Sequence, residues 1–263
     1  MPFSGKRLSI QAACLVILWT ACSSRPATLL QEAENLWFKN HYREAVRVFL
    51  QVADRYPDTQ FAETALLKIG EIFMLNLSEP DKAVEYFTRV TIEFPDSGGT
   101  FIARNFMASI YEKSLRDYDH AIIQYQKLKD SKDTRRDEYQ FAIGRCYYSK
   151  GDFRQAIIEY RTLLTSHPNS KLIPEAQYEI GNSYFVMNNC EEAKKQYRKT
   201  LEEYPDIEWR SDILLSLGIC LEEKEEYGQA LQLYKGLLDK YHNKALIKKK
   251  VDSVLARMKD KNR

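Results

Sequence analysis

The sequence is poor in the two residues that most often interrupt helices. Its 263 residues include 10 glycines and 8 prolines, while 44% are hydrophobic and 29% are charged. Glycine and proline mark turns and loops, so a chain with few of them and many alternating apolar and charged positions suits helices better than short strands. The composition therefore favours an all-α protein.

The sequence also lacks an excess of either charge. Lys and Arg number 39 against 37 Asp and Glu. Proteins that bind nucleic acids depend on a basic surface, so we expect no nucleic-acid partner. The charge is uneven only at the C-terminal end, where residues 244–263 are mostly basic.

Motifs that carry catalysis or bind metals and phosphates are missing as well. The four histidines are His41, His120, His167 and His242, and none stands in an HExxH pattern. Glycine never occurs as GxGxxG or GxxxxGK. We therefore expect no enzyme, no metal, no cofactor and no small-molecule substrate.

Cysteine is scarce and irregularly spaced. After Cys22 the sequence has only Cys146, Cys190 and Cys220, with no CxxC pair. This spacing fits neither a zinc site nor a disulfide framework. We interpret the three as small buried hydrophobic residues, and a bridge between Cys190 and Cys220 is the alternative.

No apolar run reaches the roughly 20 residues that a membrane-spanning helix needs. The longest begins at Leu8 and ends at Trp19, follows Lys6 and Arg7, and leads into "TACSS". These are the proportions of a secretory signal peptide covering residues 1–21. An uncleaved anchor and a buried core segment are the alternatives.

Ala21-Cys22 after this run resembles the lipobox of bacterial lipoproteins. The resemblance implies cleavage before Cys22, lipidation of Cys22 and a lipid-proximal linker at residues 22–27. Ser23 implies the periplasmic face of the outer membrane as the location. Trp19 departs from the pattern, which usually has leucine there, so an ordinary cleaved signal and a soluble periplasmic protein remain the alternative.

A repeat of 35 to 38 residues runs through the rest of the chain. Six alanines are each followed four residues later by an aromatic residue, and a small residue precedes most of them by 12 or 13 positions. A proline closes four of the units, at Pro57, Pro95, Pro168 and Pro205. Each unit therefore reads as two helices with a turn between them. The alanines are Ala45, Ala83, Ala121, Ala156, Ala193 and Ala230.

These positions resemble the tetratricopeptide repeat, most plainly in "AIGRCYYSKGDFRQAIIEYRTLLTSHP" at residues 142–168. The resemblance implies a right-handed α-solenoid of about six helix pairs over residues 28–243. Repeats two and three have one extra residue in the turn between helices. Residues 127–138 lack the closing proline and are highly charged, which indicates either a flexible joint or a long solvated turn.

A stack of such pairs implies a groove lined by the first helix of each pair, where an extended peptide or a helix of an envelope protein could bind. Counting from the small residue, positions three before, one after and four after it are expected to point into this groove. Alternatively, the large aromatics among them pack inside the superhelix. The expected groove residues are Trp37, Glu71, Met74, Phe141, Arg145, Tyr148, Tyr178, Asn182 and Phe185.

The C-terminal stretch, residues 244–263, has apolar residues at helical spacing and reads as an amphipathic helix that caps the last repeat. Its charged face is either solvated or meets an acidic partner or anionic lipid. That face comprises Lys248, Lys249, Lys250, Arg257, Lys259 and Lys261.

Together these features predict a scaffold lipoprotein that mediates protein–protein interactions. The chain resembles the tetratricopeptide lipoprotein of the outer-membrane β-barrel assembly machinery and the periplasmic repeat protein associated with the Tol-Pal system. The first resemblance implies a role in outer-membrane protein assembly, and the second a role in envelope maintenance. Alternatives are a pilotin-like lipoprotein for a pilus or secretion secretin, and a cell-wall-binding accessory protein whose aromatic groove stacks sugars.

Overall fold

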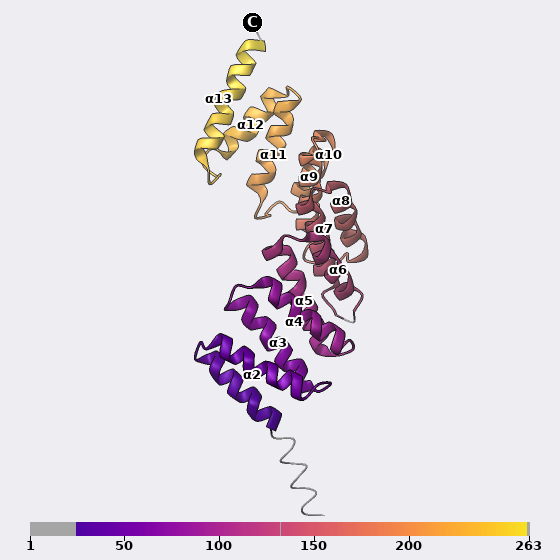
Figure 1. Ribbon diagram of the computed structural model, residues 1–263. Helices are drawn as coiled ribbons and strands as arrows, with labels where there is room; N and C mark the ends of the chain where they lie inside the picture. The colour runs from indigo at the N-terminus through magenta and orange to yellow at the C-terminus, as the bar shows by residue number, and fades with distance from the viewer. Residues whose placement is uncertain (1–24, 132, 262–263) are drawn as a thin grey trace, which may run out of the picture. The chain divides into compact units, whose positions relative to one another are not determined.

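The computed structural model describes residues 25–131 and 133–261, and this part of the chain is built from helices without strands (Figure 1). A helical segment at residues 25–38 comes first. The elements that follow are α2 (Tyr42–Arg55), α3 (Gln60–Leu75), α4 (Pro80–Glu93), α5 (Gly98–Ser109), η1 (Ile110–Leu115), α6 (Tyr118–Lys129), α7 (Arg136–Lys150), α8 (Phe153–Ser166), α9 (Ile173–Val186), α10 (Cys190–Glu203), α11 (Arg210–Glu223), α12 (Tyr227–Leu237) and α13 (Lys244–Lys261). This order confirms six helix pairs followed by one further helix.

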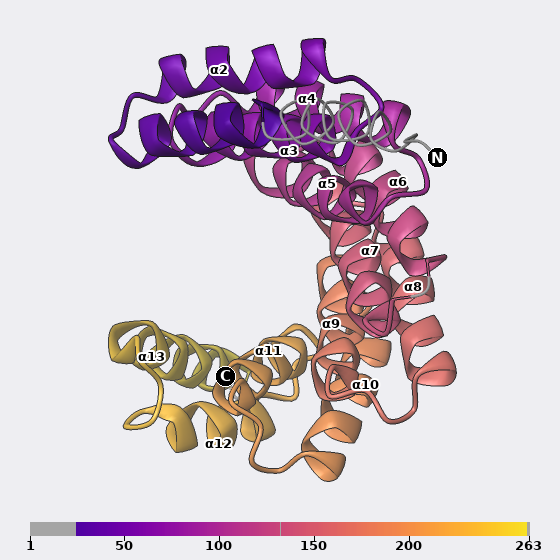
Figure 2. The same cartoon turned by 90° about the horizontal axis from the view of Figure 1, so that it is seen from below.

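The chain divides into two compact units, one ending at Gln124 and the other beginning at Tyr125. The division lies within α6. In the first unit α3 packs on α2 and α4, and α4 packs on α5. In the second unit consecutive helices pack from α7 to α13. Figure 2 shows that α7, α9 and α11 line one side of this second unit while α8, α10 and α12 line the other.

The repeated alanine and aromatic residues form the core of each pair. All six alanines are completely buried, and most of the aromatics that follow them, such as Phe87 and Tyr160, are too. The small residue on the first helix leaves room for this ring, since a Cβ on Gly144 would lie only 2.7 Å from the Tyr160 ring. Gly70, Gly181 and Gly218 face Phe87, Tyr197 and Tyr234 in the same way. The repeat pattern is therefore a close contact between the two helices of one pair.

The turn inside each pair contains a residue with a left-handed backbone. These residues lie five positions before the repeated alanine, and only one of them is glycine, Gly151 with φ 87°. Left-handed backbone reverses the chain direction after a helix and satisfies its last carbonyl groups. The other five are Asn40, Ser78, Arg116, Asn188 and Glu225. The turn geometry is therefore constant although its residue type is not.

The extra residue of repeat three lies in the helix instead of the turn. The end of its first helix widens into the π-helix η1, and Arg116 then adopts the left-handed conformation with φ 54°. A π-helical turn accommodates one residue more than an α-helical turn. The expected longer turn is therefore wrong for this repeat, because the insertion is absorbed before the turn begins.

The charged stretch at residues 127–138 is partly helical. Helix α6 continues to Lys129, with Leu128 fully buried, and α7 begins at Arg136. Between them the Ser131 hydroxyl donates to the Leu128 carbonyl at 2.6 Å, and Arg135 pairs with Asp133 at 3.0 Å. On both sides of residue 132, the described residues of this connection are therefore held by local side-chain contacts. Whether it acts as a joint stays a prediction.

An acidic residue near the start of a first helix contacts the next repeat in three places. Glu63 accepts a hydrogen bond from the Gly99 amide at 2.8 Å, where α5 begins. Asp137 accepts from the Ser170 hydroxyl at 2.6 Å, and Asp212 accepts from the Tyr241 hydroxyl at 2.9 Å. The Glu63 contact satisfies an amide at the start of α5 that lacks a helical partner. The other two contacts use side-chain hydroxyls of the connection that follows.

Cys190 and Cys220 form a disulfide, with their Cα atoms 5.2 Å apart. It joins the first residue of α10 to α11, and thus repeat five to repeat six. Both side chains are buried, as the sequence indicated, but their interpretation as free hydrophobic residues is wrong because the two helices bring them face to face. Cys146 is buried and takes no part in this disulfide.

Helix α13 covers the last repeat with Ile247, Val251 and Val254, all buried against α12. Part of its basic face is directed inward. Lys250 and Arg257 lie 3.0 and 3.5 Å from the buried carboxylate of Glu222, and Lys261 lies 2.6 Å from Glu225. Two of its six cations, Lys250 and Arg257, therefore attach the helix to Glu222, while the Lys261–Glu225 pair lies at the exposed surface.

Within the described residues, no helix combines the length and the apolar character needed to cross a membrane. The predicted signal peptide and residues 22–24 of the predicted linker, which include Cys22, lie outside the described residues, whereas residues 25–27 belong to the first helical segment. These predictions stay as they were.

Candidate functional site

The first helices of the second unit present a continuous set of aromatic and polar side chains. We call it the α7–α9–α11 surface and define it by Arg145, Tyr148, Tyr178, Glu179, Asn182 and Trp209. Each of these side chains is at least partly exposed. The glycines of the same helices face the second helices, which leaves this set of side chains available at the opposite edge.

Tyr178 is the centre of the aromatic part. Its ring stacks on Trp209 with centroids 5.8 Å apart and planes 2° from parallel. It also contacts the Tyr197 ring at 6.3 Å. Burial against these rings raises the pKa of the Tyr178 hydroxyl, although a hydrogen bond with Asn182 opposes the shift. The stacked pair is a rigid apolar platform with polar edges, a common anchor in protein interfaces.

Glu179 lies beside this platform in an unusual setting for a carboxylate. Its burial raises its pKa, and the nearby Glu175 carboxylate adds to the increase. A hydrogen bond from Asn182 and the charge of Arg145 act in the opposite direction. Asn182 also accepts a hydrogen bond from the Tyr197 hydroxyl at 2.8 Å. Glu179 and Asn182 are therefore held in place by the core beneath them.

The structure brings four of the residues expected in repeats four and five to this surface. Arg145 is exposed, and Tyr148 is half-buried with its edge against the Phe153 ring at 5.2 Å. Tyr178 and Asn182 complete the four. Whether any of them binds a partner stays a prediction.

The other two residues expected in these repeats lie elsewhere. Phe141 is only 6% exposed and contacts the Tyr160 ring at 5.3 Å, so it belongs to the core and not to an open groove. Phe185 is half-buried against the cluster around Tyr197 and the disulfide. At the position three before the glycine both Phe141 and Tyr178 contact the tyrosine of the second helix, but Tyr178 also stacks on Trp209 and stays partly exposed.

The three residues expected in repeats one and two lie in the first unit. The Trp37 Nε1 donates to the Asn76 side chain at 2.9 Å, and the Lys68 ammonium lies 5.4 Å from the Trp37 ring. Lys68 also pairs with Glu71 at 3.0 Å, so it connects Trp37 to Glu71. Met74 is partly buried against the core of this unit.

Sequence reasoning missed several residues of these sets. Trp209 lies in the linker before α11, outside the counted positions, and Glu179 precedes the glycine by two residues. In the first unit it missed Lys68, Asn76 and the 90% exposed Phe38. The only available signal for Trp209 was its type, since tryptophan is scarce in this chain.

Catalytic or metal chemistry has no visible basis in these sets. Among the described residues, no three His, Cys, Asp or Glu side chains are placed to hold a metal ion. The histidines of the first unit pair locally, His120 with Asp117 at 2.7 Å and His41 with Glu44 at 3.5 Å. The geometry of the α7–α9–α11 surface suits contact with another macromolecule, because its rings and polar groups are spread over three helices.

Comparison with known proteins gives the same answer for the fold. Models of the tetratricopeptide repeat match residues 30–98 and 178–245, which together make more than half of the chain, and a second such model matches residues 138–170. The chain belongs to the tetratricopeptide repeat family. Proteins of this family are protein–protein interaction scaffolds and are generally not enzymes.

Solved structures with this fold share little sequence with the chain. PilW, described as a widely conserved type IV pilus biogenesis factor, is 19% identical with a TM-score of 0.53, over 88% of this chain and 98% of PilW. The C-terminal part of a repeat protein from Cytophaga hutchinsonii is 22% identical with a TM-score of 0.58, over 80% and 78%. YrrB, described as having an unusual peptide-binding site, is 13% identical with a TM-score of 0.53, over 76% and 95%. No curated protein matches the chain.

Proposed function

We propose that this chain is a non-enzymatic adaptor lipoprotein at the periplasmic face of the outer membrane. In this proposal a lipid on Cys22 tethers it, and it gathers envelope proteins for outer-membrane protein assembly or envelope maintenance. The observation that carries the binding role is the α7–α9–α11 surface, where the Tyr178–Trp209 stack lies beside Arg145, Glu179 and Asn182. Aromatic anchors supply apolar contact area, and the polar groups orient a bound segment.

The chemistry of this surface favours an extended protein segment as the ligand. The exposed guanidinium of Arg145 suits a carboxylate of the partner, and a guanidinium can bind such a group with two hydrogen bonds. Asn182 and the Tyr148 hydroxyl suit backbone groups. Because the rings are already packed against the core, binding costs little side-chain ordering.

The disulfide supports a location outside the cytoplasm. Disulfides persist in oxidising compartments such as the bacterial periplasm and are rare in the cytosol. The Cys190–Cys220 bridge agrees in this respect with a signal peptide at residues 1–21. Neither feature by itself distinguishes a tethered protein from a soluble periplasmic one.

A pilotin-like role beside a pilus or secretion secretin is the second candidate. It is favoured by PilW, a pilus biogenesis factor whose fold this chain shares over 98% of the length of PilW. At 19% identity this likeness concerns the fold alone. A cell-wall role of the Tol-Pal or division type remains a third candidate, in which the aromatic platform would stack sugars.

The tether is tested by metabolic labelling with a fatty-acid analogue and membrane fractionation of cells that express the native chain or Cys22→Ser. We expect label and outer-membrane residence in the native protein and the loss of both in the variant. An unlabelled, soluble native protein would contradict the lipid anchor but not the adaptor role.

The adaptor role is tested with a photo-crosslinking amino acid placed at Tyr178 in living cells. A matched probe at the exposed Lys195 of α10 serves as the control. We expect crosslinks to one envelope protein from position 178 and none from position 195. A barrel-assembly protein as the product supports the first candidate, a secretin the second and peptidoglycan the third. Equal crosslinking from both positions would count against this surface as the binding site.

A further inference from the structure

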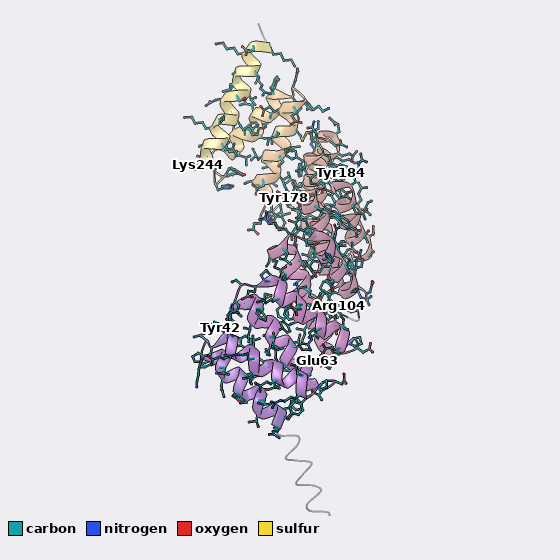
Figure 3. All side chains as sticks on the ribbon, viewed as in Figure 1. Tyr42, Glu63, Arg104, Tyr178, Tyr184 and Lys244 are labelled. Carbon is teal, nitrogen blue, oxygen red and sulfur yellow. A yellow bond between two sulfur atoms is a disulfide. The ribbon has the colours of Figure 1, made fainter. Side chains whose placement is uncertain are left out.

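The opposite side of the second unit has a second feature suited to binding. A hollow of about 410 Å³ lies between α8 and the turn that joins α9 to α10. Helix α8 contributes Arg154, Ile157, Ile158 and Arg161, spaced i, i+3, i+4 and i+7 so that they share one face. Tyr184 and Met187 line the other wall. Tyr184 and Tyr178 are both on α9, and Figure 3 labels their positions.

The floor of this outer hollow is apolar. Ile158 is 53% exposed, whereas the adjacent Ile157 is buried. Tyr184 and Met187 are half-buried at its side. An exposed apolar residue alone is ordinary on a protein surface, but here it lies between two cations.

Neither cation has a carboxylate partner among the described residues. The Arg161 guanidinium donates to the Tyr184 hydroxyl at 2.9 Å and lies 5.9 Å from the same ring, so its only partner is neutral. Arg154 is exposed and takes part in no ion pair within the described chain. The hollow therefore carries two positive charges that form no ion pair with the described residues of the second unit.

Other repeats of this chain close the same place with an acid. The residue just before the second helix of repeat two, Glu79, pairs with Arg43 on α2 at 2.9 Å. The residue just before the second helix of repeat six, Glu226, pairs with Lys194 on α10 at 3.0 Å. The corresponding residue of repeat five is Asn189, which caps α10 through the Glu192 amide at 3.4 Å and carries no charge.

We propose that this outer hollow binds a helix of a partner protein that presents two carboxylates on either side of an apolar side chain. The two arginines are seven residues apart on α8, which is about 10.5 Å along a helix. A partner helix with acidic residues at the same spacing and leucines between them would complement both the charge and the apolar floor. This site does not depend on the α7–α9–α11 surface or on the lipid anchor.

The test measures binding of a fluorescent, alanine-rich helical peptide to the full chain by anisotropy. The peptide carries two glutamates two turns apart with two leucines between them, and a matched peptide carries glutamines instead. We expect the glutamate peptide to bind more tightly than the glutamine peptide. Its affinity should fall as salt is added, since exposed charges are screened. Equal affinity of the two peptides, or no binding of either, would overturn the proposal.

Variants of the chain locate the site. The double change Arg154→Gln and Arg161→Gln is expected to lower the affinity for the glutamate peptide by about fivefold or more, because it removes two charge-assisted contacts. Asn189→Asp keeps a good helix cap and places a carboxylate where repeats two and six have one. Because this carboxylate would neutralise the cations of the hollow, the change is expected to weaken binding as well. Arg43→Gln, at the matching but neutralised position of repeat one, is the control. A loss of the same size in Arg43→Gln would show that the peptide responds only to net charge.

Discussion

The four packing glycines are the residues at which the repeat tolerates the least change. At Gly144 a Cβ would lie 2.7 Å from the Tyr160 ring, and at Gly218 it would lie 2.5 Å from the Tyr234 ring. Both rings are almost completely buried and have no room to move aside. Glycine is needed here because the ring of the second helix lies so close to its Cα. Its backbone conformation is that of an ordinary helix and does not by itself require glycine.

Gly144→Ala is therefore expected to destabilise the second unit by about 1–3 kcal/mol through overpacking. Urea unfolding followed by circular dichroism measures the change. Gly236→Ala is the control, because Gly236 is also helical but has no atom within 4 Å of its Cβ position. That change is expected to stabilise by about 0.5–1 kcal/mol. Stabilisation of similar size in both variants would mean that helix propensity, and not the ring contact, dominates.

Glu179 gives the second unit a pH-dependent stability. Its pKa in the folded state is raised above 4.5, chiefly by burial, so the folded protein holds the proton more tightly than the unfolded chain. Stability is therefore greatest below the unfolded pKa and falls as pH rises through the folded pKa. The charged groups that face it are Glu175 on its own helix and Arg145 on α7.

Glu179→Gln is expected to raise the melting temperature at neutral pH and to leave it unchanged at a pH well below 4.5. Thermal unfolding across this range measures the difference. A melting temperature that is lower in the variant at neutral pH would mean that Arg145 and Asn182 stabilise the carboxylate more than burial penalises it.

At the scale of elements, α13 is attached by a buried carboxylate as well as by apolar contacts. Glu222 on α11 has a side chain only 5% exposed and accepts hydrogen bonds from the Tyr234 hydroxyl at 3.1 Å and from Lys250 at 3.0 Å. Burial raises the pKa of Tyr234, and so do the negative charge of Glu222, which disfavours the tyrosinate, and the hydrogen bond that Glu222 accepts from it. The Glu222 carboxylate thus connects α11, α12 and α13.

Glu222→Ala is expected to destabilise the second unit by about 1–3 kcal/mol, because it leaves buried polar groups without their partner. Limited proteolysis should then cut before α13 first. Glu225→Ala is the comparison, since Glu225 pairs with Lys261 at the exposed surface, where such pairs contribute little. If α13 is released equally in both variants, its attachment depends on the apolar face alone.

The helix pairs could be predicted from the sequence because their contact recurs at a fixed spacing. Ala156, Tyr160 and Gly144 form one small unit, and its repetition is visible without coordinates. The left-handed turn residues were not visible, since Asn40, Arg116 and Glu225 share a conformation but no residue type. Phe141 was misplaced because spacing from the glycine cannot separate a ring packed on its own pair from a ring exposed at the same helix position.

At the scale of the whole molecule, the disulfide links repeats five and six covalently. Without it, these neighbouring repeats would be held together only by non-covalent contacts. It closes a loop with a sequence separation of 30 residues. In a stack of repeats, stability is roughly the sum of local contacts, so one crosslink affects the repeats that it joins more than distant ones. The sequence offered this pairing only as the alternative to free buried cysteines, because cysteine spacing does not show which helices pack together. The packing of α10 on α11 brings the two side chains together.

Reduction, or Cys220→Ser, is expected to destabilise the second unit by about 3–4 kcal/mol on the chain-entropy model for a loop of this length. Chemical denaturation with and without reductant measures the effect, and peptide mapping without reductant should recover Cys190 and Cys220 in one crosslinked product. Cys146→Ser is the control for loss of a thiol outside the bridge. Unlinked peptides in the untreated protein would show that the bridge does not form.

The same bridge limits how far the chain can be pulled out. When a protein is stretched from its ends, each unfolded residue adds at most about 3.6 Å of length. The segment between Cys190 and Cys220 is bypassed by the crosslink, so about 100 Å of chain stays hidden until the disulfide is reduced. The oxidised molecule is therefore a shorter and stiffer tether under mechanical load than its reduced form, although the two have the same sequence.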